Sequence, residues 1–441
     1  MINILKNKMK SLSGDKKSVL ALLGGTTIAQ GLNFLFSPIQ TRLFSPEVFG
    51  ELSVFTSITG IIGIIICLSY DQGIVLPKEE DEGFSILKLS WLFAFIVSLI
   101  SFILFSVFNK RIYSLFNATA LTNYWYYVPI TLFLTGIIQA ANYWLIRKER
   151  FTILSYNKVL PLLALNLVSI GLGFAGNKAL GARLFSILVS SLVNIVVIFS
   201  VIVKDLQVKE RIRYKKSALI VKYKNFLLYD IWSNLINNLS WMLVPILLNS
   251  YFGSFVAGQY SISLKVIQLP ASIIGASIGQ VFLKTASQKK HTNELYSYTI
   301  LMVKKLFIYT IPFAIILAVF GKTLFEFIFG EKWGAAGLYT QILALWAVVW
   351  FVASPISNVV IILQKQYFSL FTSFINLITR IVSLLIGRYF NSVIIGLVLF
   401  SVSGFIVSGI SLFFCIYLAK IDANASSNLK CDIAFRKHFR R

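Results

Sequence analysis

The stretch Gly31-Leu-Asn-Phe-Leu-Phe-Ser-Pro-Ile-Gln-Thr-Arg-Leu-Phe-Ser-Pro-Glu-Val-Phe-Gly-Glu-Leu-Ser53 joins the end of one apolar helix to the start of the next. Within it, we expect Pro38 to interrupt the first helix and Arg42 to lie where that helix leaves the membrane. Ser45-Pro46-Glu47 has the order of an N-cap, a proline at the first helical position and an acid in the first turn. The stretch therefore predicts two membrane helices joined by a tight turn.

The helix that ends in this stretch has one polar face. Thr26, Gln30, Asn33 and Ser37 recur at helical spacing among apolar residues. In hydrocarbon, a polar face needs either a protein partner or water. We expect this face to line a central cavity.

The composition identifies the class of protein. Of the 441 residues, 57% are hydrophobic and only 13% are charged, which excludes a soluble globular protein. The apolar residues form runs of about 20, the length that crosses a bilayer core. The three cysteines (Cys67, Cys415 and Cys431) and the two histidines are far apart, so we expect neither a disulfide framework nor a metal site. The sequence predicts an all-α integral membrane protein.

We place about 12 transmembrane helices along the chain. The first apolar run follows several lysines, as in a signal peptide, but the number of further spans favours a retained helix. The shortest connection is the tight turn at residues 388–392, between the last two spans. The predicted spans cover residues 18–41, 50–70, 87–108, 123–146, 152–174, 179–203, 226–249, 256–283, 296–320, 336–363, 367–389 and 393–419.

These spans form two halves of six on either side of a basic linker. Both halves enter the membrane in the same sense, so an internal repeat is expected to be parallel, related by an axis along the membrane normal. The polar residues and proline of the seventh span weakly echo those of the first. The predicted domains are an N-terminal lobe at 1–203, a basic cytoplasmic linker at 204–225, a C-terminal lobe at 226–419 and a basic cytoplasmic tail at 420–441.

Lysines and arginines set the orientation of the chain. With both termini in the cytoplasm, most of the 41 basic residues lie in inner segments, whereas the inverted topology would place them outside. The net charge of +24 therefore reflects topology and contact with anionic membrane lipids. Nucleic acid is not an expected partner, because the charge lies in short loops beside apolar spans.

Two basic residues, Lys265 and Arg380, lie well inside predicted spans. A basic side chain at mid-membrane costs about 2.5–3.5 kcal/mol. Each is therefore expected to face water, an acid or an anionic ligand. Pairing with Asp71 or Asp230 is the structural alternative to a ligand.

Two stretches of the chain, at residues 41–50 and 245–270, resemble a known family. Leu43-Phe-Ser-Pro-Glu-Val-Phe-Gly50 after Thr41-Arg42 resembles the signature turn of polysaccharide (O-antigen/capsule) repeat-unit flippases. These belong to the multidrug/oligosaccharidyl-lipid/polysaccharide exporter superfamily, which also contains multidrug extruders and lipid II flippases. The second half is similar to the family's seventh and eighth helices in Pro245, Phe252-Gly253, Gly258-Gln-Tyr-Ser261 and Leu269-Pro270.

The resemblance implies two six-helix lobes around a central cavity. It further implies a flippase, not an enzyme, that moves an undecaprenyl-diphosphate-linked oligosaccharide repeat unit between leaflets of the bacterial inner (cytoplasmic) membrane by alternating access. The chain lacks the two extra C-terminal spans of lipid II flippases, which favours an O-antigen, capsule or other exopolysaccharide unit as cargo. A polymerase and a chain-length regulator of the same pathway are the implied protein partners.

Candidate residues follow from the chemistry of such a cargo. A diphosphate needs cations, and sugars need amide and aromatic side chains. Asp71 and Asp230 are candidates for pairing with these cations or for binding a coupling proton or sodium ion, and no other cofactor is expected. The candidate cargo contacts are Arg42, Lys265 and Arg380 for the anionic head group and Gln30, Asn33, Asn234 and Asn238 in the lumen.

Two other functions are weighed against export of a lipid-linked saccharide. A multidrug/cation antiporter of the same superfamily is expected to have an acidic lumen, whereas the charges inside these spans lean basic. An integral membrane polysaccharide polymerase or ligase is expected to carry a large external loop. Here the longest polar segment, at about 204–225, faces the cytoplasm, and Glu326 with Glu331 is a thin candidate for an external catalytic pair.

Overall fold

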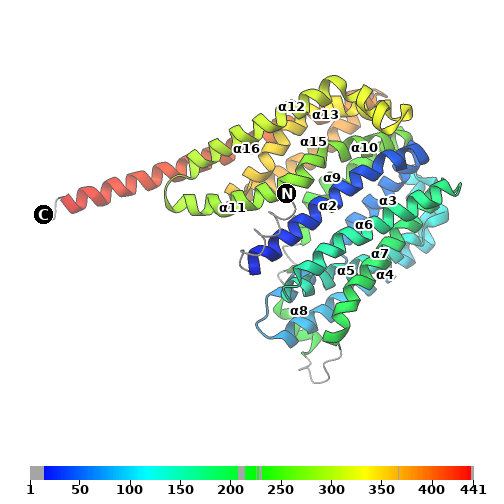
Figure 1. Ribbon diagram of the computed structural model, residues 1–441, viewed down its shortest axis with the longest axis horizontal. Helices are drawn as coiled ribbons and strands as arrows, with labels where there is room; N and C mark the ends of the chain where they lie inside the picture. The colour runs from blue at the N-terminus through cyan, green and yellow to red at the C-terminus, as the bar shows by residue number, and fades with distance from the viewer. Residues whose placement is uncertain (1–13, 207–213, 225, 228–230, 366, 439–441) are drawn as a thin grey trace, which may run out of the picture. The chain divides into compact units, whose positions relative to one another are not determined.

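The computed structural model describes residues 14–206, 214–224, 226–227, 231–365 and 367–438. These residues form helices joined by short turns, and no strand occurs among them (Figure 1). Contacts along the chain group it into two compact units, residues 1–261 and 262–441. The predicted all-α fold is confirmed.

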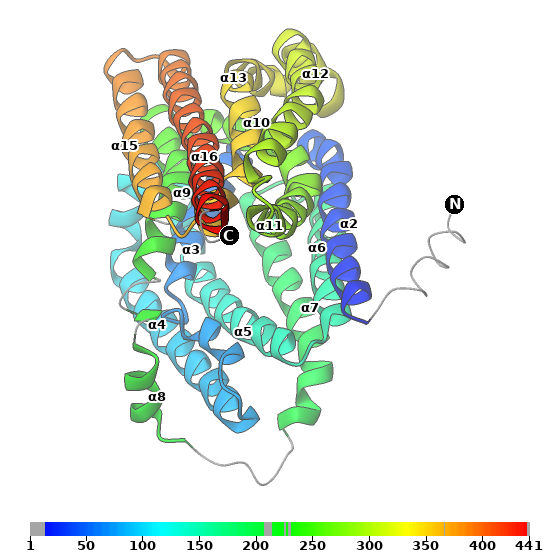
Figure 2. The same ribbon diagram turned by 90° about the vertical axis from the view of Figure 1, so that its left-hand side faces the viewer.

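The first unit is a bundle of long helices with short 3-10 segments. In it α2 packs on α6, α6 on α7, α4 on α5 and α3 on α9 (Figures 1 and 2). Its elements are α2 (Gly14–Leu43), α3 (Pro46–Ile64), η1 (Tyr70–Val75), α4 (Glu80–Leu115), η2 (Thr119–Tyr124), α5 (Tyr127–Arg147), α6 (Phe151–Phe174), α7 (Leu180–Leu206), α8 (Lys216–Lys222), α9 (Ile231–Phe252) and the start of α10 (Ser254–Pro270).

The second unit contains the end of α10 and the helices that follow it. There α13 packs on α12 and α16, and α15 packs on α16 (Figure 2). Its further elements are the π-helical turn η4 (Ala271–Gly275), α11 (Ala276–His291), α12 (Leu295–Phe329), η5 (Glu331–Trp333), α13 (Gly334–Ile356), α14 (Asn358–Ile362), α15 (Tyr367–Tyr389) and α16 (Val393–His438).

Each predicted span overlaps a helix or a pair of helices. In the described part of the chain, nine helices are long and apolar enough to cross a membrane, and a bent pair at 254–290 makes ten. The predicted first and seventh spans coincide with α2 and α9, which are 30 and 22 residues long. The chain is therefore a multi-pass membrane protein. Large apolar side chains such as Phe95, Phe102 and Ile103 of α4 are exposed, as lipid contact requires.

The turn at the start of α3 forms as predicted. Ser45 is the N-cap in extended conformation, proline is at the first helical position and Glu47 is in the first turn. The expectation that Pro38 interrupts the preceding helix is wrong, because α2 continues through it to Leu43. The Ser37 hydroxyl donates to the Asn33 carbonyl at 2.7 Å, close to the carbonyl that a proline leaves unbonded. Such side-chain bonds let a membrane helix tolerate proline.

Two predicted spans differ from the observed helices. The span expected at 50–70 ends at Ile64, and Leu68 and Ser69 in the turn that follows adopt left-handed backbone angles (φ 50° and 59°). The span expected at 256–283 is two helices with a 43° bend at the π-helical turn after Pro270. The turn between α15 and α16, at residues 390–392, is as short as predicted.

The two units divide the chain at a different position from the predicted lobes. The division falls within α10, because α9 packs on α3 and the start of α10 contacts the start of α3. The lobes at 1–203 and 226–419 were defined by counting spans, and they stay a prediction.

Candidate functional site

Some polar side chains of α2 form hydrogen bonds to α6, and others between them are half-buried. Thr26 accepts a hydrogen bond from the Lys158 ammonium of α6 at 2.8 Å. Gln40 donates to Asn166 of α6 at 2.7 Å, and both side chains are buried. Gln30 and Asn33, two of the residues predicted to contact cargo, lie between these anchors and are half-buried.

The candidates near the ends of α2 and α9 lie in more open positions. Arg42 is exposed in the last turn of α2. On α9, Asn234 is exposed, and Asn238 is half-buried and donates to the Asn234 carbonyl at 2.8 Å. Asp230 lies outside the described residues, so its predicted role stays a prediction.

The two basic candidates of the second unit differ in burial. Lys265 is half-buried near the end of α10. Arg380 of α15 is 5% exposed, and its Cζ atom lies 5.7 Å from the ring centroid of Trp346 and 5.3 Å from that of Phe400. Aromatic faces attract a guanidinium, most strongly away from water. Arg380 therefore lies inside the unit beside aromatic rings, and its expected contact with water, an acid or an anionic ligand stays a prediction.

Asp71 lies in η1, directly after the left-handed turn that ends the second span, and is 1% exposed. Its Oδ2 atom accepts a hydrogen bond from Gln139 Nε2 of α5 at 2.9 Å, whereas its Oδ1 atom has no partner. Burial raises the pKa of this carboxyl, and the hydrogen bond from Gln139 acts in the opposite direction. The described residues contain no group of three or more His, Cys, Asp or Glu side chains that would hold a metal ion.

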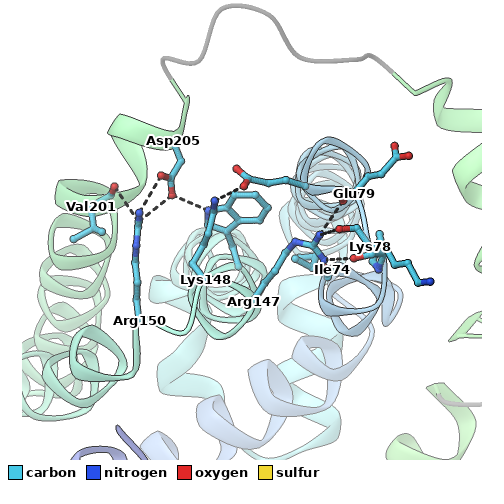
Figure 3. A network of polar contacts seen from close by, with 11 residues as sticks. Ile74, Lys78, Glu79, Arg147, Lys148, Arg150, Val201 and Asp205 are labelled. Carbon is cyan, nitrogen blue, oxygen red and sulfur yellow. Dashed lines mark hydrogen bonds and ion pairs between the residues drawn. The ribbon is translucent and has the colours of Figure 1, made fainter. Parts of the chain in front are cut away.

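A network of ionic contacts joins the end of α5 to its neighbours (Figure 3). The Arg147 guanidinium donates to the carbonyls of Ile74, Pro77 and Glu79 at 3.0, 2.7 and 2.8 Å. Beside it, Lys148 pairs with Glu80 at 2.6 Å. These contacts hold the segment between η1 and α4 against α5.

The same network extends to α7. Arg150 binds Asp205 through two hydrogen bonds of 2.9 and 3.0 Å, and Trp144 Nε1 donates to the same carboxylate at 3.0 Å (Figure 3). A bidentate arginine–carboxylate pair fixes orientation as well as distance. The ends of α5 and α7 are therefore joined by side chains as well as by packing.

The described residues 216–223 of the predicted linker pack against η1 and the start of α4. Lys222, in α8, pairs with Glu82 at 2.5 Å, and Tyr223 donates to the same carboxylate at 3.0 Å. Tyr70 of η1 donates to the Ile220 carbonyl at 3.1 Å. The pKa of Lys222 is raised because its ammonium is bonded to Glu82. Residues 216–223 therefore bind the start of α4 and η1.

Two polar side chains missed as candidates also lie inside the first unit. Gln139 belongs to a polar stripe on α5, but spacing alone does not reveal that its partner is Asp71. Arg183 is 7% exposed, donates to Ser169 at 2.8 Å and lies 5.3 and 4.8 Å from the ring centroids of Phe44 and Phe49. Its place near the start of a predicted span was the only signal in the sequence.

The starts of α3 and α10 approach each other unusually closely. A Cβ atom at Gly50 would lie 1.9 Å from the Ser254 carbonyl oxygen, and one at Gly258 would lie 1.8 Å from the Pro46 carbonyl oxygen. The two contacts are reciprocal, since the glycine of each helix meets the backbone of the other. Only glycine allows this backbone contact.

Several solved structures are similar to this chain in fold. The chain is similar to an inward-facing multidrug resistance MATE family transporter of the MOP superfamily, with a TM-score of 0.72, 14% identity and coverage of 90% of this chain and 96% of that one. For the lipid II flippase MurJ in an inward closed conformation, the TM-score is 0.69 at 14% identity, over 93% and 92% of the two chains. For a mutant of the Vibrio cholerae MATE transporter VcmN, it is 0.60 at 14% identity, over 94% and 97%.

Comparison of the sequence with family models identifies the family, which similarity of fold alone does not. No curated protein matches the chain. The family model described as "Polysaccharide biosynthesis protein" matches residues 39–337, more than half of the sequence and including both helix turns that carry the resemblance. The chain therefore belongs to the polysaccharide biosynthesis protein family.

Proposed function

We propose that this protein is a flippase that moves an undecaprenyl-diphosphate-linked oligosaccharide repeat unit from the inner to the outer leaflet of the bacterial cytoplasmic membrane. The product serves the assembly of O-antigen, capsule or another exopolysaccharide. Two findings together support the proposal. The chain matches the polysaccharide biosynthesis protein family, and its fold is similar to that of a lipid II flippase.

The physics of the cargo supports a transporter. A diphosphate and several sugars cannot cross hydrocarbon unaided, because their polar groups would lose water without replacement. Helical lobes that rock about a central site can supply polar groups in place of that water and open the site to each side of the membrane in turn. The lipid tail can stay in the bilayer throughout.

The proposed cargo contacts are those expected from the sequence. Arg42, Lys265 and Arg380 neutralise the diphosphate, and amide side chains bind sugar hydroxyls. The positions of Lys265 in α10 and Arg380 in α15 support this role, because a cation within an apolar helix attracts an anion more strongly than one in water. The lumen amides are Gln30, Asn33, Asn234 and Asn238. A pathway polymerase and a chain-length regulator are the proposed protein partners, and both termini are proposed to face the cytoplasm.

The main alternative is a multidrug/cation antiporter, because MATE transporters share the fold at the same 14% identity. The family match to polysaccharide biosynthesis favours the flippase. The basic side chains at Lys265 and Arg380 favour an anionic cargo as well, since cationic drugs would be repelled.

Complementation tests the proposal. The chain is expressed in a bacterium that lacks its own repeat-unit exporter and makes the matching glycan, and surface polysaccharide is measured against accumulated lipid-linked intermediate. Wild type is expected to restore surface polysaccharide and clear the intermediate. If the intermediate accumulates unchanged while the protein is present in the membrane, the flippase proposal fails.

Substitutions in the same assay test the proposed head-group site. Lys265→Ala and Arg380→Ala are expected to lose export at normal membrane abundance, whereas Arg388→Ala, at the exposed end of α15, retains it. Arg380→Lys keeps the charge but not the planar stacking on Trp346 and Phe400. Export by Arg380→Lys supports a role of charge, and normal export by both alanine variants removes these residues from the site.

A further inference from the structure

Asp71 is a buried acid that follows two residues in strained backbone conformations. Leu68 and Ser69, two consecutive residues other than glycine, adopt left-handed angles just before it. Such conformations cost free energy and persist only where the surrounding structure requires them. Here the turn directs the chain back into the first unit, where the Asp71 side chain is 1% exposed.

The partners of Asp71 leave half of its carboxyl group unsatisfied. Gln139 donates to Oδ2, and the backbone N–H groups of Asp71 and Gln72 also bond the carboxyl group. Oδ1 has no hydrogen-bond partner. No lysine or arginine of the described chain forms an ion pair with Asp71, and Arg147 of the adjoining helix donates instead to carbonyls of residues 74–79. A buried carboxylate without a cation is costly as an anion.

We propose that Asp71 is a proton-binding site, neutral in the arrangement seen here and ionised when the segment 65–75 opens to water. A proton fits better than a metal ion, because hard cations need several oxygen ligands and Asp71 belongs to no group of three or more His, Cys, Asp or Glu side chains among the described residues. Neutralisation removes the desolvation cost of the anion while the bond from Gln139 to Oδ2 remains.

The other titratable groups around Asp71 have separate roles or titrate elsewhere. Cys67 on its own segment and Tyr143 on α5 interact with it electrostatically, and such groups ordinarily titrate at about 8.5 and 10. On α4, Glu80 pairs with Lys148 and Glu82 pairs with Lys222. The remaining charged residues at the start of α4 are Asp81 and Lys88, and Lys88 lies over the Phe84 ring at 4.6 Å.

The segment that carries Asp71 is hydrogen-bonded to α5 and α8, so a change in the charge of Asp71 can affect both helices. Gln139 joins it to α5, and Tyr70 joins it to α8 through the Ile220 carbonyl. Ionisation in the arrangement seen here creates a buried charge, which favours any conformation that hydrates the segment. Resting on the proposed function, this makes Asp71 the coupling site at which proton release on the cytoplasmic side accompanies cargo movement.

The test for proton binding requires no cargo. The melting temperature of the purified full chain in detergent is measured from pH 4 to pH 8. Because burial raises the pKa above its ordinary value of 3.8, the folded protein binds more protons than the unfolded chain between the two values. Stability then falls as the pH rises through that window. We expect wild type to lose a few degrees across it.

Three variants make this test specific. Asp71→Asn keeps the shape of the side chain and is expected to remove this fall. Gln139→Leu removes the bond that favours the anion, so the fall is expected to move to higher pH. Glu80→Gln, at an exposed ion pair, is the control and keeps the wild-type profile. If Asp71→Asn folds and has the same pH profile as wild type, Asp71 does not bind the proton.

A second measurement tests coupling. In the complementation assay, Asp71→Asn is expected to lose export at normal abundance although it folds. Full export by Asp71→Asn overturns the coupling role. If wild type itself exports nothing, the proposed function fails, whereas the melting profiles still decide whether Asp71 binds a proton.

Discussion

Buried arginines illustrate how single residues organise this protein. Arg183 in the first unit and Arg380 in the second each lie beside two aromatic rings, and neither is more than 7% exposed. Rings can stabilise a guanidinium that has been withdrawn from water. Arg183 thereby contacts Phe44, in the turn that joins α2 to α3, and Phe49, in the first part of α3.

Gly50 provides a stability prediction at the residue scale. Its Cα atom is so close to the Ser254 carbonyl that a methyl group would force the starts of α3 and α10 apart. We expect Gly50→Ala to lower the melting temperature in detergent by several degrees, corresponding to about 1–3 kcal/mol of overpacking. Gly31→Ala is the matched control, since nothing lies within 4 Å of its added methyl group. Equal stability of the two variants would contradict the close contact.

At the scale of elements, the end of α5 serves as the point of attachment for its neighbours. Arg147 binds the carbonyls between η1 and α4, and the next ionic contacts reach α4 and α7 (Figure 3). Backbone carbonyls at helix breaks need donors where water is scarce. An arginine supplies several in one plane, which lysine does not.

The pair of Arg150 and Asp205 carries a prediction about these elements. Asp205→Ala removes the acceptor of Arg150 and of the buried Trp144 N–H, so we expect a loss of roughly 2–3 kcal/mol. Glu80→Ala breaks the more exposed pair with Lys148 and should cost less than about 1 kcal/mol. Thermal unfolding of the purified variants measures both. A larger loss in Glu80→Ala would show that the exposed pair matters more than the half-buried one.

At the scale of the whole molecule, the positive charge predicts the direction in which the chain crosses the membrane. Cysteines are introduced singly at Lys178 and Lys78, both exposed between helices, in a Cys431→Ser background that leaves the buried Cys67 and Cys415. In intact cells, a membrane-impermeant maleimide is expected to label Lys178→Cys and not Lys78→Cys. Labelling in the reverse pattern would invert the topology.

Several features of the fold were predictable because they depend on neighbours in the sequence. Ser45-Pro46-Glu47 begins α3 through capping and fixed proline geometry, and the turn before α16 follows from the short polar break between two apolar runs. The same reasoning was wrong at Pro38. The helix continues through this proline, and the Ser37 hydroxyl donates to the Asn33 carbonyl in the preceding turn.

The candidate site was predictable only in part, because its geometry depends on residues far apart in the sequence. The position of Arg380 in an apolar run placed it within a helix span, but its aromatic neighbours Trp346 and Phe400 come from two other helices. Asp71 was singled out as a candidate for charge pairing or ion binding, yet its observed side-chain partner is the amide of Gln139, 68 residues away.

The sequence by itself determined that this chain is a multi-pass helical membrane protein, because apolar length and basic loops act locally through transfer to lipid. Only the tertiary structure decided which polar groups meet inside it. The contact of Gly50 with Ser254 and the burial of Asp71 beside α5 depend on how helices pack. Packing places side chains by shape and hydrogen bonding between distant segments, which no local pattern specifies.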